Sequence, residues 1–411
     1  MKTLILLSKQ FPFGNKEQYI SHELKYLSEK FDHVIIYPHD HFKKSDTLEF
    51  ELPNNCQIVD LNVTVGRVSK LWPSVVFLWL FFRELLVVKR KGWWIRNCRK
   101  FYGMWLTQWS LSNGLERFVS HNVSRESEIV YYSYWFSMSA VCLSILKWRG
   151  KIKHFVCRAH ALDLYHEEWK SPNPNIFSLP FRFFKQRNVD ILFPISDHGK
   201  QFLLRSMSPE KLERRYLGVF DFGLNPEQKN SGEFVVVSCS GVDERKRIHL
   251  IGNALSQLNR PVRWIHFGDG PLKQLAIDSV TSKQVVFDYR GQTPNKEIRS
   301  FYNEHHVDVF VNVSMSEGLP VAIMESMSHG IPAIGVKDFG TSEIVIDRYT
   351  GRLLPQGFSS GDLVEAFQYM MDSAESKVYR DNARKHFTEF FNADANYADF
   401  AARLAGLGKQ Y

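Results

Sequence analysis

Residues 307–336 read VDVFVNVSMSEGLPVAIMESMSHGIPAIGV. The apolar run 307–313 predicts a buried strand and the run 332–336 predicts another, with a polar turn and a helix-compatible segment between them. Strand, helix and strand in this order make a parallel βαβ unit, because parallel strands need a crossover connection. The stretch therefore predicts an α/β fold. The same pattern predicts further strands upstream, over residues 234–239, 263–267 and 285–287.

The first half of the chain shows the same organisation. Strands are expected over residues 3–7 and 34–37, and between them apolar residues recur at i, i+4, i+7 and i+11 from Ile20, which is helical spacing. A length of 411 residues exceeds what one hydrophobic core holds, so two domains are expected. Two such domains would leave a ligand cleft between the carboxyl ends of their sheets.

The stretch 223–232, GLNPEQKNSG, is rich in turn residues and has no apolar periodicity, so it suits a linker. We therefore predict Rossmann-like domains over residues 1–222 and 233–385. The remaining residues, 386–411, are expected to form a C-terminal helical segment.

Composition excludes several classes of protein. Hydrophobic residues make up 44% of the chain and charged residues 23%, which excludes global disorder. The five cysteines form no close pair, so a disulfide framework and a zinc ribbon are not indicated and a reducing cytoplasm is expected. The apolar start over residues 3–7 is too short for a signal peptide.

The formal net charge of +8 has a location. Between Gly66 and Lys100 there are nine Lys or Arg and one acid, Glu84. Such a block suggests an anionic membrane surface or nucleic acid, but the cations alternate with aliphatic runs and no nucleic-acid recognition module is evident. The apolar run 71–82 falls short of the roughly 20 residues that span a bilayer. Residues 71–100 thus predict either interfacial attachment, which we favour, or a buried helix followed by a solvated basic turn.

The loop and helix start inside 307–336 predict an anion site. Pro320 suits the first position of a helix, where its missing N–H costs nothing. The amides of Gly318, Leu319 and Val321 would then be open to a diphosphate. Glu317 and Glu325 flank this site and could accept hydroxyl hydrogen bonds from a sugar on one side and a ribose on the other.

These residues resemble the signature of family 4 glycosyltransferases of the GT-B fold. The resemblance rests on Glu317-Gly-Leu-Pro320, on Glu325 eight positions after the first Glu, and on Gly330-Ile-Pro332. It continues in order through Phe11-Pro-Phe-Gly14 with Glu17, Arg158-Ala-His-Ala-Leu-Asp163, Ile195-Ser196, Leu217-Gly-Val219, Lys246, Gly268-Asp-Gly-Pro271, Gly291, Asp308 and Gly340-Thr-Ser-Glu343. The resemblance implies two Rossmann-like domains facing across a cleft, with the C-terminal helix returning to the first domain.

The resemblance also implies roles for single residues. Glu325 would bind the ribose of a nucleotide sugar, and Glu317 would contact the transferred sugar. Lys246 would neutralise the diphosphate, which is physically reasonable because the sequence has no metal-holding Asp-x-Asp pair. Gly14 would let the backbone approach the same phosphates, and His160 would contact the donor sugar or the acceptor from the cleft wall.

Four further positions stay open. Many relatives have an Arg five or six residues before the Lys, where this chain has Ser240 and Gly241, so Arg245 is either a substitute phosphate contact or a solvent-exposed residue. Arg290 would lie at the height of the nucleotide base. Asp163 would either orient its loop or cap the next helix. The turn at Gly268 would be structural or functional with equal weight, whereas Asp308 is expected to be structural.

As a whole the resemblance implies a retaining, metal-independent glycosyltransferase without a cofactor. Its donor would be a nucleotide sugar, and its acceptor a glycan, lipid-linked, in bacterial surface polysaccharide synthesis. The protein is expected in the cytoplasm, peripheral on the inner face of the membrane, with no nucleic-acid partner. An alternative is a catalytically degenerate subunit that only binds nucleotide sugar; an epimerase or phosphorylase is disfavoured by the motif set.

Overall fold

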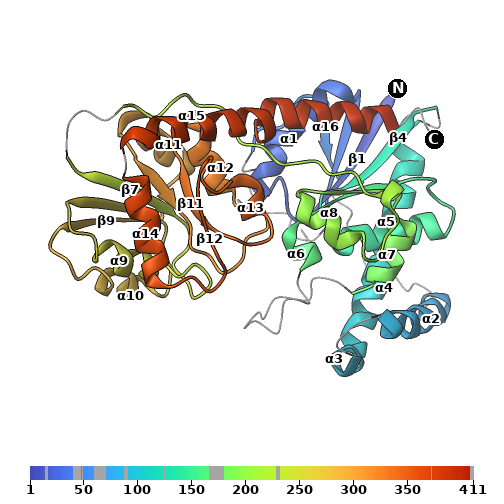
Figure 1. Cartoon of the computed structure of the whole chain (residues 1–411). Helices are drawn as coiled ribbons and strands as arrows, with labels where there is room; N and C mark the ends of the chain where they lie inside the picture. Colours follow the sequence, from blue (N-terminus) through green and yellow to red (C-terminus); the bar gives the residue numbers. More distant parts are fainter. Residues whose placement is uncertain are drawn as a thin grey trace. The chain divides into compact units, whose positions relative to one another are not determined.

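The computed structural model divides into two compact units, each described by itself. The first unit comprises Met1–Ile195, Gly199–Arg215 and Tyr397–Tyr411, and the second comprises Ser196–His198 and Tyr216–Asn396. Figure 1 shows that both are α/β layers, as the alternating pattern predicted. The structure describes residues 1–13, 17–39, 48, 50–59, 71–87, 91–124, 126–165, 180–227, 232–371 and 373–407.

The first unit is built on a six-stranded sheet in the order β3-β2-β1-β4-β5-β6, with every neighbouring pair parallel. Leu4 to Leu7 of β1 are completely buried, because helices cover both faces of such a sheet. The helix predicted from Ile20 is present as α1. The elements are β1 (Lys2–Ser8), α1 (Gln18–Lys30), β2 (His33–Pro38), β3 (Cys56–Ile58), α2 (Leu71–Val87), α3 (Lys91–Arg96), α4 (Cys98–Asn122), β4 (Glu128–Ser133), α5 (Met138–Trp148), β5 (Val156–Ala159), α6 (Ala161–Leu164), α7 (Arg182–Asn188), β6 (Ile191–Pro194) and α8 (Asp197–Leu203).

The second unit has the same topology. Its sheet runs β12-β11-β10-β7-β8-β9, again all parallel. The elements are β7 (Phe234–Cys239), α9 (His249–Leu255), β8 (Val262–Phe267), α10 (Lys273–Asp278), β9 (Val285–Gly291), α11 (Asn295–Glu304), β10 (Val309–Val311), α12 (Val321–Ser328), β11 (Ala333–Val336), α13 (Thr341–Ile344), β12 (Gly351–Leu354), α14 (Ser360–Met370) and α15 (Ser373–Phe390). The last helix, α16 (Ala393–Leu407), begins in this unit and continues in the first.

Each sheet has one topological switch point, where the connections leave in opposite directions. It lies between β1 and β4 in the first unit and between β7 and β10 in the second. The carboxyl ends of these paired strands are where doubly wound folds bind ligands. The predicted anion loop follows β10, so it emerges at one of these two points.

Two local predictions need correction. Strand β10 covers only Val309–Val311 of the predicted 307–313, although the amides of Asp308 and Asn312 still donate to neighbouring strands, at 2.9 Å in both cases. Pro320 is the N-cap of α12 and Val321 is the first helical residue, because the φ and ψ angles of Pro320, −72° and 102°, are extended.

The division between the units also differs from the predicted linker. The chain passes from one unit to the other between Arg215 and Tyr216, before residues 223–232. The reason is that residues after 216 already pack on the second unit: the amide of Val219 donates to Phe391 at 3.0 Å, and Asn225 Nδ2 donates to the carbonyl of Tyr302 at 2.6 Å. The described part of the polar stretch, residues 223–227 and 232, therefore belongs to the second unit.

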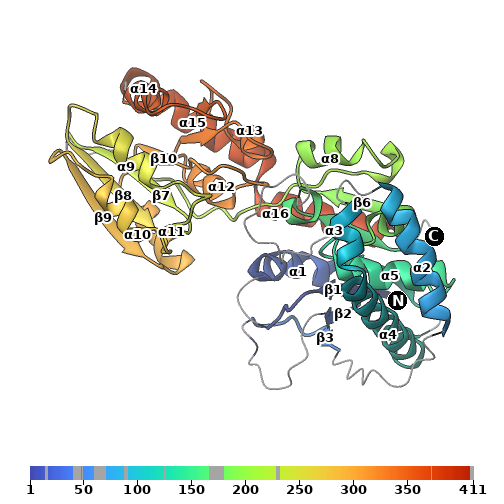
Figure 2. The ribbon, with the colours of Figure 1, turned by 90° about the horizontal axis from the view of Figure 1, so that it is seen from below.

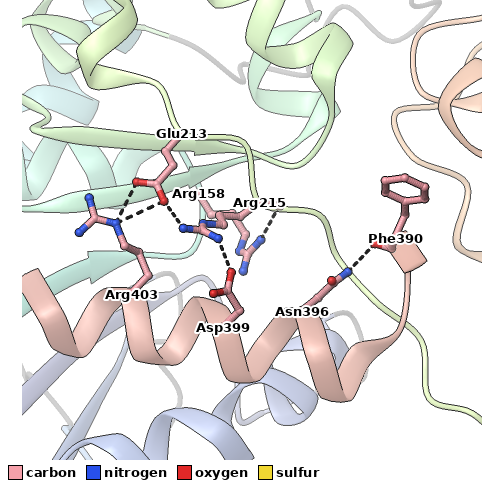
Figure 3. A network of polar contacts seen from close by, with 7 residues as sticks. All are labelled: Arg158, Glu213, Arg215, Phe390, Asn396, Asp399 and Arg403. Carbon is pink, nitrogen blue, oxygen red and sulfur yellow. Dashed lines mark hydrogen bonds and ion pairs between the residues drawn. The ribbon is translucent and has the colours of Figure 1, made fainter. Parts of the chain in front are cut away.

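Helix α16 carries the chain end back to the first unit from Tyr397 onward, as the family resemblance implied. Tyr397 lies 6.3 Å from Tyr26 of α1 between ring centroids. Figure 3 shows the polar contacts that hold this helix beside the segment after β6: Arg403 Nε pairs with Glu213 at 3.0 Å, and Asp399 pairs with Arg215. The predicted segment 386–411 therefore includes the end of α15, which belongs to the second unit.

Helices α2, α3 and α4 form an annex of the first unit, with α2 alongside α4 in both views (Figures 1 and 2). Within the described part of the chain, no helix combines the length and apolar character needed to cross a membrane. This agrees with the prediction that residues 71–82 are too short to span a bilayer.

Candidate active site

The loop from β10 to α12 carries the predicted anion site. Among the described residues, nothing accepts a hydrogen bond from the amides of Gly318 or Leu319, and Val321 begins the helix, where amides have no intrahelical acceptor. The backbone at Gly340, at the start of α13, packs closely against this loop: a Cβ added to Gly340 would lie 1.6 Å from the carbonyl oxygen of Gly318. The amides therefore project from a backbone that its neighbour holds in place.

Glu317 is the centre of the polar contacts in this loop. Its carboxylate pairs with Lys246 Nζ, and Arg245 NH1 lies 3.9 Å from its second oxygen. Arg245 also donates to the carbonyl of Ser316 at 3.3 Å, while nearly half of its side chain is exposed. Of the two possibilities for Arg245, its position beside Glu317 keeps the substitute phosphate contact open as a prediction.

Asp338 holds the other side of Glu317, and the sequence reasoning missed it. Its carboxylate accepts the backbone amide of Glu317 and, at 2.6 Å, that of Phe339. Burial raises the pKa of Asp338 to about 6, although both amide donors act against this shift. The only available signal was its position two residues after the end of β11, at the carboxyl edge of the sheet.

Glu325 lies on the first turn and a half of α12 and is enclosed by neighbouring side chains. Asn295 Nδ2 donates to its Oε1 at 2.7 Å. Burial raises the pKa of Glu325, and the nearby charge of Arg299 acts in the opposite direction. A partly desolvated carboxylate of this kind can bind vicinal hydroxyls strongly, since few waters compete for its oxygens.

Arg290, Gly268 and Asp308 are the other residues of the second unit that the sequence singled out. Arg290 pairs with Asp288 at 2.7 Å and is nearly half exposed, so it lies at the end of β9 with its guanidinium already partnered. Gly268 has φ +129°, and a Cβ there would lie 1.9 Å from the carbonyl oxygen of Ser240, which supports the structural interpretation of that turn. Asp308 accepts the amide of Val235 at 2.7 Å and has the expected structural position.

In the first unit, His160 is enclosed at the end of β5. Its Nε2 lies 3.1 Å from the carbonyl of Tyr134, so the proton is on Nε2 and Nδ1 is left as an acceptor. Burial and the charge of Arg158 lower the pKa of His160 to about 3, which keeps the imidazole neutral at physiological pH. Asp163 accepts the amide of His160 at 3.0 Å and that of Phe136 at 3.2 Å, so it both caps α6 and orients the loop.

The residues around His160 include two that sequence reasoning did not assign. Trp135, which follows β4, contacts His160 with the ring centroids 4.4 Å apart and the ring planes tilted by 40°, and Lys9 Nζ lies 4.3 Å from the Trp135 ring. Buried Glu17 accepts the Trp135 indole N–H and the amides of Gln10 and Phe11, at 2.5 and 2.7 Å. Glu17 thus anchors the loop after β1. Gly14 of that loop lies outside the described residues.

The two constellations form at the switch points of the two sheets, one in each unit. Lys246 and Glu317 follow β7 and β10; Lys9 and Trp135 follow β1 and β4. The predicted approach of His160 and Glu317 across a cleft stays a prediction. The described residues contain no group of three His, Cys, Asp or Glu side chains that could hold a metal ion.

Comparison with known proteins agrees with this geometry. Residues 221–386 match the family model of the group 1 glycosyl transferases. A putative colanic acid biosynthesis glycosyltransferase, WcaL of Salmonella typhimurium, is 28% identical over 276 residues, which are 62% of this chain and 64% of that protein. The amylovoran biosynthesis glycosyltransferase AmsK of Erwinia amylovora is 33% identical over 220 residues, 49% of each chain. The chain therefore spans between about half and two thirds of the length of these curated relatives.

Solved structures show the same fold at low sequence identity. Sucrose-phosphate synthase from Thermosynechococcus elongatus superposes with a TM-score of 0.73 at 16% identity and covers all of both chains. The lipopolysaccharide outer core galactosyltransferase WaaB gives 0.67 at 15% identity, again over both whole chains. Anabaena HepE in complex with UDP and glucose gives 0.64 at 15% identity, covering 99% of this chain and 100% of that one. The predicted GT-B fold is confirmed.

Proposed function

Because the chain belongs to the family 4 glycosyltransferases of the GT-B fold, we propose that it transfers a sugar from a nucleotide-sugar donor to a glycan acceptor. Retention of anomeric configuration and independence from metal are properties of that family. The proposal for this chain rests on one observation: a lysine and a glutamate, Lys246 and Glu317, are paired beside the open amides of Gly318 and Leu319.

This pairing suits a leaving diphosphate. The loop amides offer hydrogen bonds to phosphate oxygens, and Lys246 offers a full positive charge at the same place. Lys246 is held by Glu317 and by the turn before α9, where its amide donates to Asp243 Oδ1 at 3.0 Å, so little reorganisation is needed when charge develops on the phosphate. Preorganised charge of this kind is the main source of catalysis where no enzyme nucleophile is used.

Glu325 supplies the ribose contact in this proposal. Its carboxylate is half-buried and accepts a hydrogen bond from Asn295, which leaves acceptor capacity on the second oxygen for a hydroxyl. Such a contact exists equally in the ground state and the transition state. Glu325 should therefore act on nucleotide affinity and Lys246 on turnover.

His160 and Trp135 are the residues of the first unit that this proposal assigns to substrate binding. His160 is a buried neutral imidazole, and the half-buried indole of Trp135 lies next to it, with Lys9 Nζ 4.3 Å from the Trp135 ring. Aromatic rings of this kind supply apolar contact area with a polar handle, which suits a sugar ring. We assign them to the transferred sugar or the acceptor. Closure of the two domains would then exclude water from the departing diphosphate.

The acceptor is proposed to be a lipid-linked glycan of bacterial surface polysaccharide synthesis. The support is the sequence similarity to proteins named for colanic acid and amylovoran synthesis. We propose that the protein works in the cytoplasm, attached peripherally to the anionic inner face of the membrane where such an acceptor is presented, through residues 71–100.

A nucleotide panel followed by a hydrolysis assay tests this function. The full chain is first heated with UDP, GDP, ADP and CDP, since a bound nucleotide raises the melting temperature. The matching nucleotide sugars are then followed for nucleotide release. Lys246→Ala should lower turnover about 100-fold with nucleotide affinity nearly unchanged. Glu325→Ala should weaken nucleotide binding roughly 10- to 100-fold, the cost of losing a hydrogen bond to a charged group.

Lys283→Ala is the matched control, because Lys283 is exposed in the turn before β9, at the amino end of that strand, whereas the donor site lies at the carboxyl ends of the strands. It should behave as wild type. Nucleotide binding without any release from a nucleotide sugar would support the alternative, a degenerate binding subunit. Wild-type turnover in Lys246→Ala would overturn the assignment of the leaving-group cation.

A further inference from the structure

Helix α2 exposes one continuous apolar face. A helix advances about 100° per residue, so positions 71, 72, 75, 78, 79, 82, 83 and 86 fall within an arc of about 140°. All eight are exposed. Seven of them are apolar and between 46% and 77% exposed; we call these the α2 stripe: Leu71, Trp72, Val75, Leu78, Trp79, Phe82 and Leu86.

The opposite face of α2 is fixed in the core of the annex. Val76, Phe77, Leu80 and Phe81 pack in one cluster with the aromatic rings of α4 and α7. Trp105 of α4 also donates its indole N–H to the carbonyl of Pro73 at 2.9 Å. The stripe is therefore presented by a firmly docked helix. Of the predicted alternative, a buried helix followed by a solvated basic turn, the structure shows only one face of the helix buried.

The charges next to the stripe have one sign. Arg83 lies at its edge, with its guanidinium 5.6 Å from the Trp79 ring, and the exposed cations Lys91 and Arg96 follow on α3. Glu84 is completely buried and accepts the amide of Phe184 at 3.1 Å. No carboxylate is exposed on α2 or α3. An apolar face with exposed cations on its own helix and on the next one is complementary to an anionic lipid surface.

We propose that α2 lies parallel to an anionic bilayer and inserts the α2 stripe at the boundary of headgroups and acyl chains. Its 17 residues give a contact about 25 Å long. Lipid is favoured over a protein partner because the stripe offers almost no hydrogen-bonding groups, apart from two indoles of the kind that concentrate at membrane interfaces. The inference deepens the membrane attachment proposed above and rests on it, but it adds an apolar contribution that salt does not screen.

Vesicle sedimentation with the full chain tests the stripe. The probes are vesicles of phosphatidylcholine and phosphatidylglycerol at 7:3 and vesicles of phosphatidylcholine alone. The variant Leu78→Ser with Phe82→Ser removes apolar insertion without changing charge, and it should lower partitioning onto both vesicles at least about 10-fold. Val378→Ser is the matched control, since Val378 is an isolated apolar residue on α15 with 57% exposure.

The charge contribution is tested separately by Lys91→Gln with Arg96→Gln, which should weaken binding to the anionic vesicles only. Far-UV circular dichroism and urea midpoints verify that the variants are folded. Unchanged binding of the Leu78 and Phe82 variant would overturn the proposal, as would complete loss of wild-type binding in 0.5 M salt. A lipid-free dimer that the same variant converts to monomer would overturn it in favour of a second copy. None of these readouts involves sugar transfer, so their failure leaves the donor site untouched.

Discussion

Replacing Gly340 with alanine should damage the donor loop from outside it. Gly340 is the N-cap of α13 and has φ −99°, so alanine can adopt its backbone conformation without strain. The added Cβ is the problem: it would lie 1.6 Å from the carbonyl oxygen of Gly318 and 3.1 Å from Cα of Leu319. Real Cβ atoms stay at least 3.0 Å from such atoms, so one backbone segment has to move.

The geometry sets the size of the effect. Relief of the contact requires a displacement of about 1.4 Å, shared between the loop and the start of α13, and a misplacement of about 1 Å in positioning groups costs on the order of 100-fold in rate. We expect Gly340→Ala to lower turnover by about that factor. Overpacking should also cost about 1–3 kcal/mol of the free energy of unfolding.

Nucleotide release from the donor and nucleotide binding are the measurements, each made on Gly340→Ala and on the control Gly361→Ala. Gly361 lies in the first turn of α14, and its Cβ would meet only Ser359 Oγ at 3.6 Å. The control should keep wild-type activity and gain up to about 1 kcal/mol of stability from helix propensity. Gly340→Ala with wild-type turnover and nucleotide affinity would show that the loop tolerates the displacement, and the reasoning would be refuted.

The remaining predictions concern stability. The pKa of His160 is about 3 in the folded protein, below its ordinary value of 6.5, so its contribution to the free energy of unfolding is present above pH 6.5 and is lost as pH falls. In urea unfolding, the wild type should therefore lose about 2 kcal/mol more than His160→Gln between pH 7 and pH 5. Equal losses would contradict a buried neutral imidazole. Asp338 should act in the opposite direction, because its pKa is raised from 3.8 to about 6 and its ionisation destabilises the folded state as pH rises. The free energy of unfolding of Asp338→Asn relative to wild type should therefore increase by about 1–2 kcal/mol between pH 4 and pH 7. A difference between the two proteins that does not change with pH would exclude this titration. Gly218→Ala should cost about 1–3 kcal/mol, because its Cβ would lie 2.5 Å from Cα of Ala393, and an unchanged urea midpoint would count against close packing of these two segments.

Local pattern was sufficient for most of the fold. Strand β7 begins and ends where the apolar run predicted, at Phe234 and Cys239, because a strand covered on both faces is mostly apolar. The glycine and proline before α12 likewise predicted the open helix start, since these residues restrict the backbone by themselves. The family motifs added residue roles, of which the pairing of Lys246 with Glu317 is consistent with a shared diphosphate site.

The local sequence pattern could not predict contacts between residues that are far apart in the chain. Trp135 donates to Glu17 across 118 residues, and Arg215 pairs with Asp399 across 184. Nothing in the sequence around Trp135 or around Asp399 indicates which distant residue its side chain contacts. The same holds for Asp338, whose raised pKa results from burial under a loop that is 21 residues earlier in the chain.

The basic, aromatic block shows the division most clearly. Composition and periodicity determined by themselves that residues 71–100 are apolar, cationic and too short to span a membrane. They could not determine which side of α2 meets the core, because the helix is apolar all round and offers no polar face to orient it. Only the packing of Val76, Phe77, Leu80 and Phe81 against α4 and α7 decided that Trp72, Trp79 and their neighbours are left exposed, since burial is a property of the partner surfaces as much as of the helix itself.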